Sequence, residues 1–232
     1  MSETRTHLQA DHDLPTVVRL PAPWTLEGNG WIVVLRWPRG TSTTRTEFVP
    51  ESLAGSVSGP FGFLVCVDYL AAPCGPYREL LLIPGAMRFA DGDRHLSISR
   101  ILVSTWDSVV NGRANWGIPK DRADFRIEHG TRDRIVVSDA ADEICTLLFA
   151  RAHGPRFPLH TGLLPRRYRR FAQLQAGRTF HYQPSARGAL RACRLLDWQF
   201  APKLFPDLRT ARVLTSLRVE HFTMTFPVAR TT

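Results

Sequence analysis

Large apolar residues alternate with other residues along several short stretches of this chain. Between Trp31 and Trp37, and again from Phe61 to Tyr69, every second residue is large and apolar. The same alternation returns over residues 222–228. A repeat of two places alternate side chains on one face of a strand. We therefore predict a β-strand in each of these three stretches.

Further short runs have β-like composition, and turn-forming residues such as those at 91–93 separate them. Many strands at short spacing favour a sandwich or a barrel. Residues 105–113 are predicted to form one short helix, with Thr105 as its N-cap and Gly112 as its end. Residues 189–200 fit both a helix and a strand, and we favour a strand. The further runs predicted as strands are 78–83, 95–104, 134–138, 145–150 and 178–183.

The first 28 residues differ from the rest because they contain several prolines and no sustained periodicity. We predict that residues 1–28 form an extended arm, which lies across the body of the protein or across a neighbouring subunit. Residues 29–232 contain no internal repeat and no low-complexity linker. They are predicted to form a single domain.

The composition, 44% hydrophobic and 22% charged residues, is typical of a globular protein. The net charge of +9 comes from dispersed arginines, whereas a nucleic-acid-binding protein more often gathers its basic residues on one element. The densest cluster, residues 165–170, is expected to be a solvated loop or a strand edge. We therefore predict no nucleic-acid partner, although phosphate contacts by this cluster stay a third alternative.

The four cysteines lack the spacing of a zinc site, which predicts reduced, packed thiols and no metal. No apolar run is long enough to cross a bilayer, and the polar N-terminus lacks the apolar core of a secretory signal. We expect a cytoplasmic protein without a membrane partner.

Lysine is rare in this sequence, since only Lys120 and Lys203 are lysines among the 30 basic residues. Unlike arginine, a lysine can lose its proton and act as a nucleophile. Lys120 follows a small, apolar, turn-prone run, residues 111–119. Burial in apolar surroundings disfavours the ammonium form, and the neutral amine can form a Schiff base with a carbonyl. Lys203 also lies among apolar residues and prolines, so local sequence does not separate the two.

Two motifs resemble the acetoacetate decarboxylase family. Residues 75–79, Gly-Pro-Tyr-Arg-Glu, are similar to the family's Gly-x-Tyr-x-Glu segment. Residues 112–120, Gly-Arg-Ala-Asn-Trp-Gly-Ile-Pro-Lys, are similar to its Gly-Arg-Glu-x-x-aromatic-Pro-Lys-Lys signature. The order and separation of the motifs also match. The resemblance implies a mainly β fold, a closed β-barrel with few short helices and an internal pocket, and a homo-oligomer.

The resemblance also assigns roles to individual residues. It implies that Lys120 is the Schiff-base nucleophile and that Glu79 is an acid in the pocket, although Glu79 could instead be paired with a nearby arginine. Tyr77, Arg113 and Trp116 lie in the same motifs and are predicted to contact the substrate, Tyr77 by packing. The implied activity is that of a lyase, a decarboxylase acting on a small keto acid, with no organic cofactor and no metal.

Three positions depart from the family pattern. Asp121 stands in place of the second lysine, and Ala114 in place of the signature glutamate. Asn29 aligns with an arginine that in the family holds the substrate carboxylate, and Arg36 is the nearest arginine downstream. These departures leave two alternatives open. One is an aldolase-dehydratase acting on a pyruvate-like substrate, and the other is a barrel that binds a small molecule without turning it over.

Overall fold

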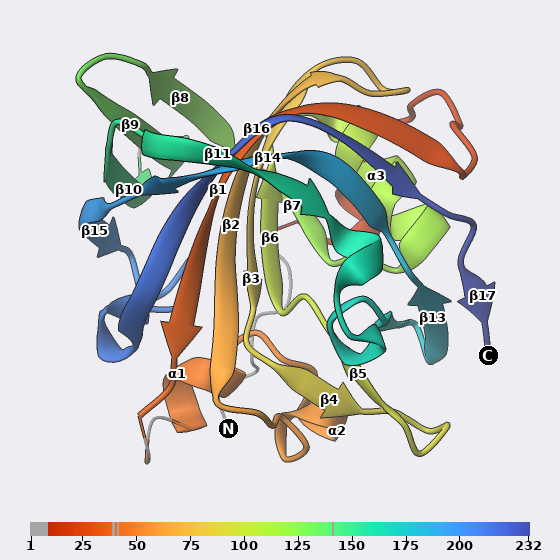
Figure 1. The fold of residues 1–232 in the computed structure, drawn as a ribbon. Coiled ribbons are helices and arrows are strands. Elements are labelled where there is room, and N and C mark those ends of the chain that lie inside the picture. Colours follow the sequence, from red (N-terminus) through yellow and green to blue (C-terminus); the bar gives the residue numbers. More distant parts are fainter. Residues whose placement is uncertain (1–8, 39, 41, 141) are drawn as a thin grey trace.

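An eight-stranded sheet runs through the middle of the protein (Figure 1), and two smaller sheets accompany it. The computed structural model describes residues 9–38, 40, 42–140 and 142–232. In spatial order, the large sheet contains β11 (His153–His160), β14 (Ser185–Cys193), β16 (Arg212–Phe226), β1 (Trp24–Arg36), β2 (Phe61–Ala71), β3 (Tyr77–Ile83), β6 (Arg100–Val103) and β7 (Lys120–Arg122).

The second sheet has four strands and the third has five. The four-stranded sheet contains β15 (Leu195–Phe200), β10 (Asp142–Ala150), β9 (Arg132–Asp139) and β8 (Asp124–Glu128). The five-stranded sheet contains β17 (Arg230–Thr231), β13 (Arg178–Tyr182), β12 (Phe171–Gln175), β5 (Arg94–Leu96) and β4 (Ala86–Arg88).

The prediction of a mainly β protein is confirmed, but that of a closed barrel is not. Over the described residues, each of the three sheets has two open edges, and no first strand pairs with the last. Most neighbouring strands are antiparallel, whereas β6 and β7 are parallel. The β6–β7 connection therefore has to cross over, and α3 (Trp106–Trp116) forms that crossover.

The large sheet is covered on both faces, which explains the continuous apolar run in β3. Leu80 and Leu82 point to a core shared with the four-stranded sheet. Leu81 and Ile83 point to a second core, shared with α3 and the five-stranded sheet. A strand that is buried on both faces needs apolar residues at successive positions. Glu79 is a buried carboxylate on the same face as Leu81.

The remaining helical segments are short, as the sequence predicts. They are α1 (Ser42–Thr46), α2 (Glu51–Ala54) and the 3-10 turns Asp11–Asp13, Thr161–Leu163, Arg166–Tyr168 and Leu208–Thr210. The arginine-rich cluster includes the turn at Arg166–Tyr168, and Arg170 in it pairs with Asp93 at 2.8 Å. Over the described residues, no helix is long and apolar enough to cross a membrane.

Helix α3 begins where the sequence predicts but ends later. The Thr105 side chain accepts a hydrogen bond from the Ser108 amide, which confirms the N-cap. The predicted end at Gly112 is wrong, because the helix continues to Trp116. Gly117 ends it in the left-handed conformation, with φ of 61°, and its N–H donates to the Arg113 carbonyl. Gly112 lies inside the helix, where the Lys120 side chain packs against it.

Two further predictions can be compared directly with the structure. Residues 189–193 and 195–200 are in strands, as favoured, but these are two strands in different sheets, β14 and β15. The four cysteines are free thiols; Cys74 is partly exposed and the other three are buried.

The N-terminal segment lies along helix α3 and is hydrogen-bonded to it. Asn111 accepts a hydrogen bond from the Leu20 amide at 2.8 Å and donates one to the Val18 carbonyl at 3.0 Å. Asn115 donates to the Leu20 carbonyl at 2.8 Å. Strand β1 already begins at Trp24, inside the predicted arm, and residues 1–8 lie outside the described part of the chain. The segment before β1 is therefore held on the helix that precedes Lys120.

Candidate active site

Lys120 and Glu79 meet in the interior of the protein. Lys120 is the first residue of β7 and Glu79 lies in β3, with β6 between the two strands. The amine Nζ lies 3.0 Å from Glu79 Oε2, and each side chain is only 5% exposed. The structure therefore places the predicted nucleophile and the predicted pocket acid in direct contact. Glu79 is paired with this lysine rather than with an arginine.

The pleat of β7 turns Asp121 away from the lysine amine. Lys120 lies opposite Ile101 and Asp121 opposite Leu102, so the two side chains point to different faces of the sheet. On its own face, the fully buried Asp121 carboxylate pairs with Arg100 and, at 2.7 Å, with Arg113. The carboxylate that replaces the family's second lysine thus belongs to an arginine network behind the amine.

Helix α3 shapes the position of the lysine side chain. Ser108 Oγ lies 2.9 Å from Nζ, and Gly112 lies one helical turn further along the same face. A Cβ atom at Gly112 would lie 2.6 Å from Lys120 Cδ and 2.8 Å from Cε. The missing side chain lets the lysine stem lie directly on the helix. This close approach is the reason for glycine at a helix-interior position, where it weakens the helix.

Two tyrosines complete the polar contacts around the amine. Nζ lies 5.1 Å from the centre of the Tyr77 ring, a distance typical of a cation–π contact. The Tyr69 hydroxyl donates to Glu79 Oε1 at 3.3 Å. Burial, and then the negative charge of Glu79, raise the pKa of both Tyr69 and Tyr77 well above the usual value. Both phenols therefore keep their protons at neutral pH and can act as donors.

A small cavity lies beside the amine, with a volume of about 20 Å³. Over the described residues, Lys120 and Glu79 are the only charged residues that line it. Trp116 and Tyr77 belong to this lining, and their contact with a substrate stays a prediction. The apolar part of the wall includes Trp24, Leu26, Leu81, Ile98 and Phe226. An internal pocket is present, but it is narrow.

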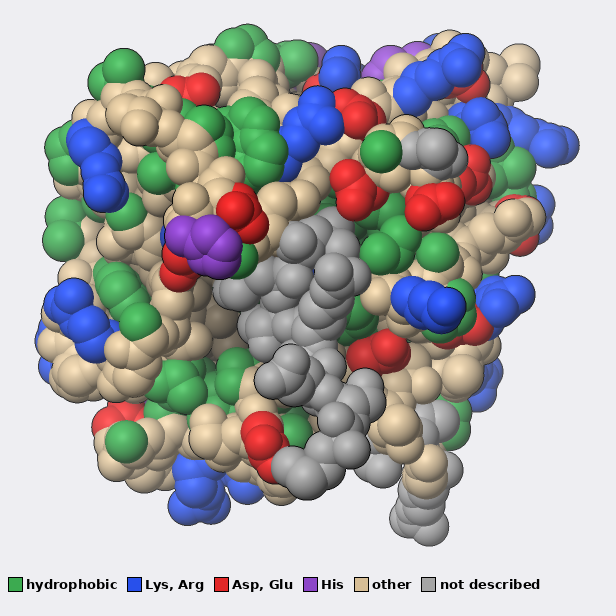
Figure 2. All heavy atoms as spheres, turned by 180° about the vertical axis from the view of Figure 1, so that it is seen from behind, with side chains coloured by type: hydrophobic (Ala, Val, Ile, Leu, Met, Phe, Trp, Pro, Cys, Tyr) green, Lys and Arg blue, Asp and Glu red, His purple; other side chains and the backbone are tan. Residues whose placement is uncertain are grey.

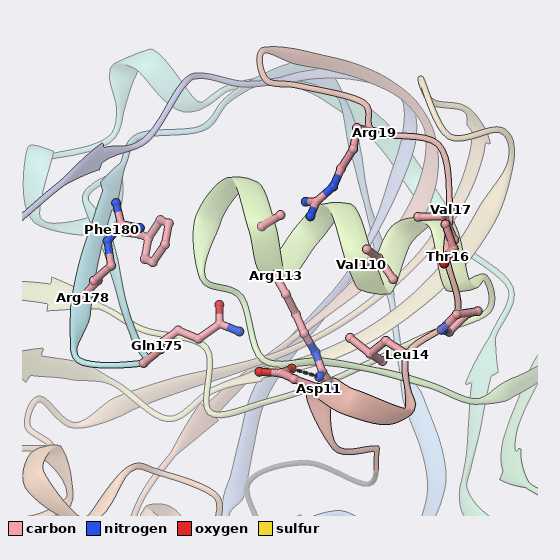
Figure 3. A pocket seen from close by; sticks show the side chains of 13 residues that line it. Asp11, Leu14, Thr16, Val17, Arg19, Val110, Arg113, Gln175, Arg178 and Phe180 are labelled. Carbon is pink, nitrogen blue, oxygen red and sulfur yellow. Dashed lines mark hydrogen bonds and ion pairs between the residues drawn. The ribbon is translucent and has the colours of Figure 1, made fainter.

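The structure does not bring Arg113 to this cavity. Its guanidinium pairs with Asp11 at 2.5 Å and with Asp121, and its Nε donates to the Lys120 carbonyl at 2.8 Å. The side chain lines a wider cleft between the N-terminal segment, α3 and β13 (Figure 3), and the volume of this cleft is about 520 Å³. Arg113 thus holds the backbone of Lys120 and ties the N-terminal segment to it.

Asn29 and Arg36 also lie away from the amine. The Asn29 side chain accepts a hydrogen bond from the His221 amide at 3.0 Å. Arg36 is exposed at the end of β1 and lines a surface cleft with Trp37 and Arg45. Over the described residues, no arginine lines the lysine cavity. The carboxylate-binding arginine expected from the family pattern therefore has no counterpart in this cavity.

The other lysine and the basic surface show different surroundings. Lys203 is exposed in a turn, so burial separates the two lysines where local sequence does not. On the face shown in Figure 2, basic side chains are scattered among acidic and hydrophobic ones. They do not form one continuous basic stripe on that face.

Sequence reasoning missed three residues that contact the site or its support. Ser108 could have been found by its spacing of four from Gly112 on the predicted helix. Tyr69 was recognised only as part of an alternating strand. Arg100 lies fully buried beneath Asp121, and its Nε donates to the Leu204 carbonyl at 3.0 Å. Its place directly before the apolar run of β6 was the available signal.

Comparisons with solved structures identify the fold. The chain superposes on an acetoacetate decarboxylase from Legionella pneumophila with a TM-score of 0.66 and 10% identity, covering 95% of this chain and 92% of the other. An acetoacetate decarboxylase-like enzyme from Sphingomonas wittichii gives 0.62 and 12%, over 96% and 98%. The enduracididine biosynthesis enzyme MppR, in complex with pyruvate, gives 0.63 and 14%, over 93% and 92%.

Neither the protein-family models nor the curated proteins contain a match. At these identities the structural likeness establishes a shared fold. The mainly β, acetoacetate decarboxylase-like fold implied by the two sequence motifs is therefore confirmed, whereas the closed barrel is not.

Proposed function

We propose that this chain, which has the acetoacetate decarboxylase-like fold, is a lyase that forms a Schiff base between Lys120 and a small keto acid. If the reaction is a decarboxylation, the products are carbon dioxide and a ketone. The observation that carries this proposal is the buried Lys120 amine, hydrogen-bonded to Glu79 and Ser108 at the wall of an apolar cavity.

The reaction uses the amine as an electron sink. Neutral Lys120 attacks the ketone carbon, and loss of water from the carbinolamine leaves a protonated imine. The bond between the α-carbon and the carboxylate then breaks, carbon dioxide leaves, and the electron pair moves to the imine nitrogen to form an enamine. A proton adds to the α-carbon, and water hydrolyses the new imine to ketone and free amine.

Glu79 is suited to move the protons that this sequence requires. Its Oε2 lies 3.0 Å from Nζ, within direct transfer distance, so the carboxylate can accept a proton from the ammonium before attack. Ser108 and the Glu79–Tyr69 contact fix the amine and the carboxylate in place. Asp121 takes no part in these transfers because its charge is met by Arg100 and Arg113 on the opposite face.

Substrate entry requires side chains to move. The cavity of about 20 Å³ has room for about one water molecule, and a keto acid is larger. The aromatic side chains of Trp116 and Phe226 line the wall. We expect these rings to change position when substrate binds, which also expels water from the amine.

A second candidate is the aldolase-dehydratase reaction. There the enamine of a pyruvate-like substrate attacks an aldehyde, and water leaves after the carbon–carbon bond has formed. The described lining of the cavity supplies no arginine to hold a β-keto carboxylate, but a pyruvate carboxylate lacks that partner as well, so it is the likeness to MppR that favours this candidate. MppR, whose fold is similar, has been solved with the condensation product of pyruvate and imidazole 4-carboxaldehyde.

A third candidate is a protein that binds a small molecule without catalysis. Binding alone would raise the melting temperature steadily as the ligand concentration exceeds the dissociation constant, and this stabilisation would survive Lys120→Ala. Covalent capture would be absent. The predicted cytoplasmic location and homo-oligomer stay predictions, and native mass spectrometry of the purified protein checks the second.

Borohydride trapping tests the proposal. The protein is incubated with a panel of small keto acids, including acetoacetate and pyruvate, and reduced with cyanoborohydride. We expect one covalent adduct by intact mass and its location on Lys120 by peptide mapping. Carbon dioxide release then indicates the decarboxylase, and a new carbon–carbon bond after addition of an aldehyde indicates the aldolase-dehydratase.

The chain supplies its own matched control, because it has one other lysine. Lys120→Arg keeps the positive charge and should abolish the adduct, whereas Lys203→Arg at the exposed turn should leave it unchanged. Absence of any adduct across the panel, or adducts that persist in Lys120→Arg, would rule out the Schiff-base mechanism.

A further inference from the structure

A second cluster of chemically active side chains lies in the five-stranded sheet. Asp91 lies in the turn between β4 and β5, His95 lies in β5, and His181 lies in β13. In the sequence, residues 91–93 are recognisable only as a turn between strands, and His181 lies too far along the chain from Asp91 and His95 for any spacing rule to connect them. The fold brings one carboxylate and two imidazoles together.

The three ligand atoms are close enough to surround one ion. His95 Nε2 lies 2.9 Å and His181 Nδ1 lies 3.8 Å from the same oxygen, Asp91 Oδ2. All three atoms lie within 4.8 Å of one another. Two ligands that bind one zinc ion at about 2.0–2.2 Å can be at most about 4.4 Å apart. Small side-chain rotations therefore suffice to close the site.

The strand between the histidines makes this approach possible. In the sheet, β12 lies between β5 and β13, and Ala172 of β12 lies directly opposite His181. Because Ala172 projects only a methyl group, the two imidazole rings meet across the middle strand, with centroids 5.0 Å apart. Phe89 packs against both rings and restricts their orientation.

The histidines have buried nitrogens without partners. His181 Nδ1 faces Asp91 but is too far from it for a hydrogen bond, and it has no other hydrogen-bond partner. His95, with a side chain only 3% exposed, likewise has one ring nitrogen without a partner. A buried polar atom without a partner is costly, and a bound cation would satisfy His181 Nδ1.

The surroundings of the cluster fit a metal ion with open coordination positions. Both histidines line a surface cleft of about 270 Å³, from which water or an anion can reach the ion. A metal ion binds the neutral form of the His181 imidazole. Its Nε2 lies 3.4 Å from Thr232 Oγ1, a contact that can orient the ring.

We propose that Asp91, His95 and His181 bind one divalent transition-metal ion, with zinc as the best match to a ligand set of two imidazoles and one carboxylate. Three protein ligands leave a position open toward the cleft. Arg170 and Arg230 also line the cleft and would favour a negatively charged ligand on the ion. The proposal does not rest on the chemistry of Lys120.

Metal titration of the purified full-length protein tests this site. After removal of metal with EDTA, Zn²⁺ is added in calorimetry, and Co²⁺ is added as a spectroscopic probe. We expect one equivalent to bind, with visible Co²⁺ absorption bands that Zn²⁺ removes. Lys120→Arg should bind metal as tightly as the unchanged protein, which separates this outcome from that of the Schiff-base tests.

Two substitutions at the less buried ligands locate the ion. Asp91→Asn keeps the turn contact that the other carboxylate oxygen accepts from the Asp93 amide, and His181→Gln keeps a polar side chain. Each should weaken Zn²⁺ binding by more than the roughly 10–100-fold caused by losing an outer-shell partner. Circular dichroism and melting without metal confirm that the variants are folded.

The matched control is another histidine–aspartate pair. His129 Nδ1 lies 2.9 Å from Asp133, and the two residues are four apart in sequence, as Asp91 and His95 are. Among the described residues, this pair is not part of a group of three possible metal ligands. His129→Gln should leave the affinity unchanged. No binding at one equivalent, binding that survives both Asp91→Asn and His181→Gln, or an equal loss in His129→Gln would each overturn the proposal.

Discussion

Gly112→Ala tests whether the contact between α3 and Lys120 controls the site. The new Cβ would lie 2.6 Å from Lys120 Cδ and 2.8 Å from Cε, whereas carbon atoms in contact lie about 3.5–4.0 Å apart. The lysine stem therefore has to move by about 1 Å. The amine would then leave hydrogen-bonding range of Glu79 or Ser108, which now lie at 3.0 and 2.9 Å.

The effects on stability and on reactivity should differ. Replacing glycine by alanine inside a helix favours folding by about 1 kcal/mol, while overpacking costs about 1–3 kcal/mol. The net loss is at most about 2 kcal/mol, which lowers Tm by about 4–8 °C in a chain of this size. A misplacement of about 1 Å at a reacting group can slow a reaction about 100-fold. We therefore expect a large loss of Schiff-base trapping in a folded protein.

Two measurements check this prediction. The first is the rate of borohydride trapping at a fixed keto acid concentration. The second is the ¹³C NMR signal of Lys120 in lysine-labelled protein, which reports the surroundings of the amine even without turnover and is readable because the chain has two lysines. Gly55→Ala is the control, because a Cβ at Gly55 meets nothing within 4 Å and φ there is −67°. An unchanged Lys120 signal together with unchanged trapping in Gly112→Ala would refute the reasoning.

Three further predictions concern groups around the site. Glu79→Gln keeps the shape of the side chain but cannot accept a proton, so the rate of adduct formation at a fixed substrate concentration should fall by about 10²–10⁴-fold. An unchanged rate would exclude Glu79 as the proton acceptor. Asp121→Asn leaves buried Arg100 without its carboxylate and should cost about 3–5 kcal/mol in urea unfolding. Asp124→Asn, at a half-exposed side chain, should cost at most about 1 kcal/mol, and equal losses would contradict the role given to the network. Burial raises the pKa of the Cys74 thiol to about 11. Because only the thiolate reacts, the rate of Cys74 alkylation, measured by peptide mass, should rise about tenfold per pH unit from pH 8 to 10. A rate that stops rising near pH 9 would contradict the effect of burial.

Much of the strand pattern could be predicted because alternation survives in the local sequence. The stretch from Trp31 and the stretch from Phe61 both lie in strands of the large sheet. The start of β1 was missed because Gly28 and Gly30 interrupt the pattern. Strand β2 approaches these glycines so closely that a side chain would clash: a Cβ at Gly28 would lie 2.3 Å from the Asp68 carbonyl oxygen. Sequence alone does not reveal how closely another strand approaches.

In the candidate site, too, local sequence identifies the residues, but the pairing of distant strands decides their contacts. Lys120 and Glu79 could be named from two short motifs, but whether Glu79 would meet the lysine or an arginine depends on which strands lie side by side. The same dependence explains Arg113, whose motif position predicts a substrate contact while the helix directs it toward Asp11 and Asp121. The metal-binding cluster depends wholly on non-local pairing, because His95 and His181 lie on strands separated by β12.

By itself, the sequence determined which residues carry reactive groups, where most strands run and where helix α3 begins, because these properties depend on side-chain chemistry and on neighbours a few residues away. Only the tertiary structure decided which of the two lysines is buried, to which side of the sheet Asp121 turns and which charges are neutralised. Those outcomes follow from strand register and from packing between segments far apart in the chain, where a shift of one residue exchanges the two faces of a strand.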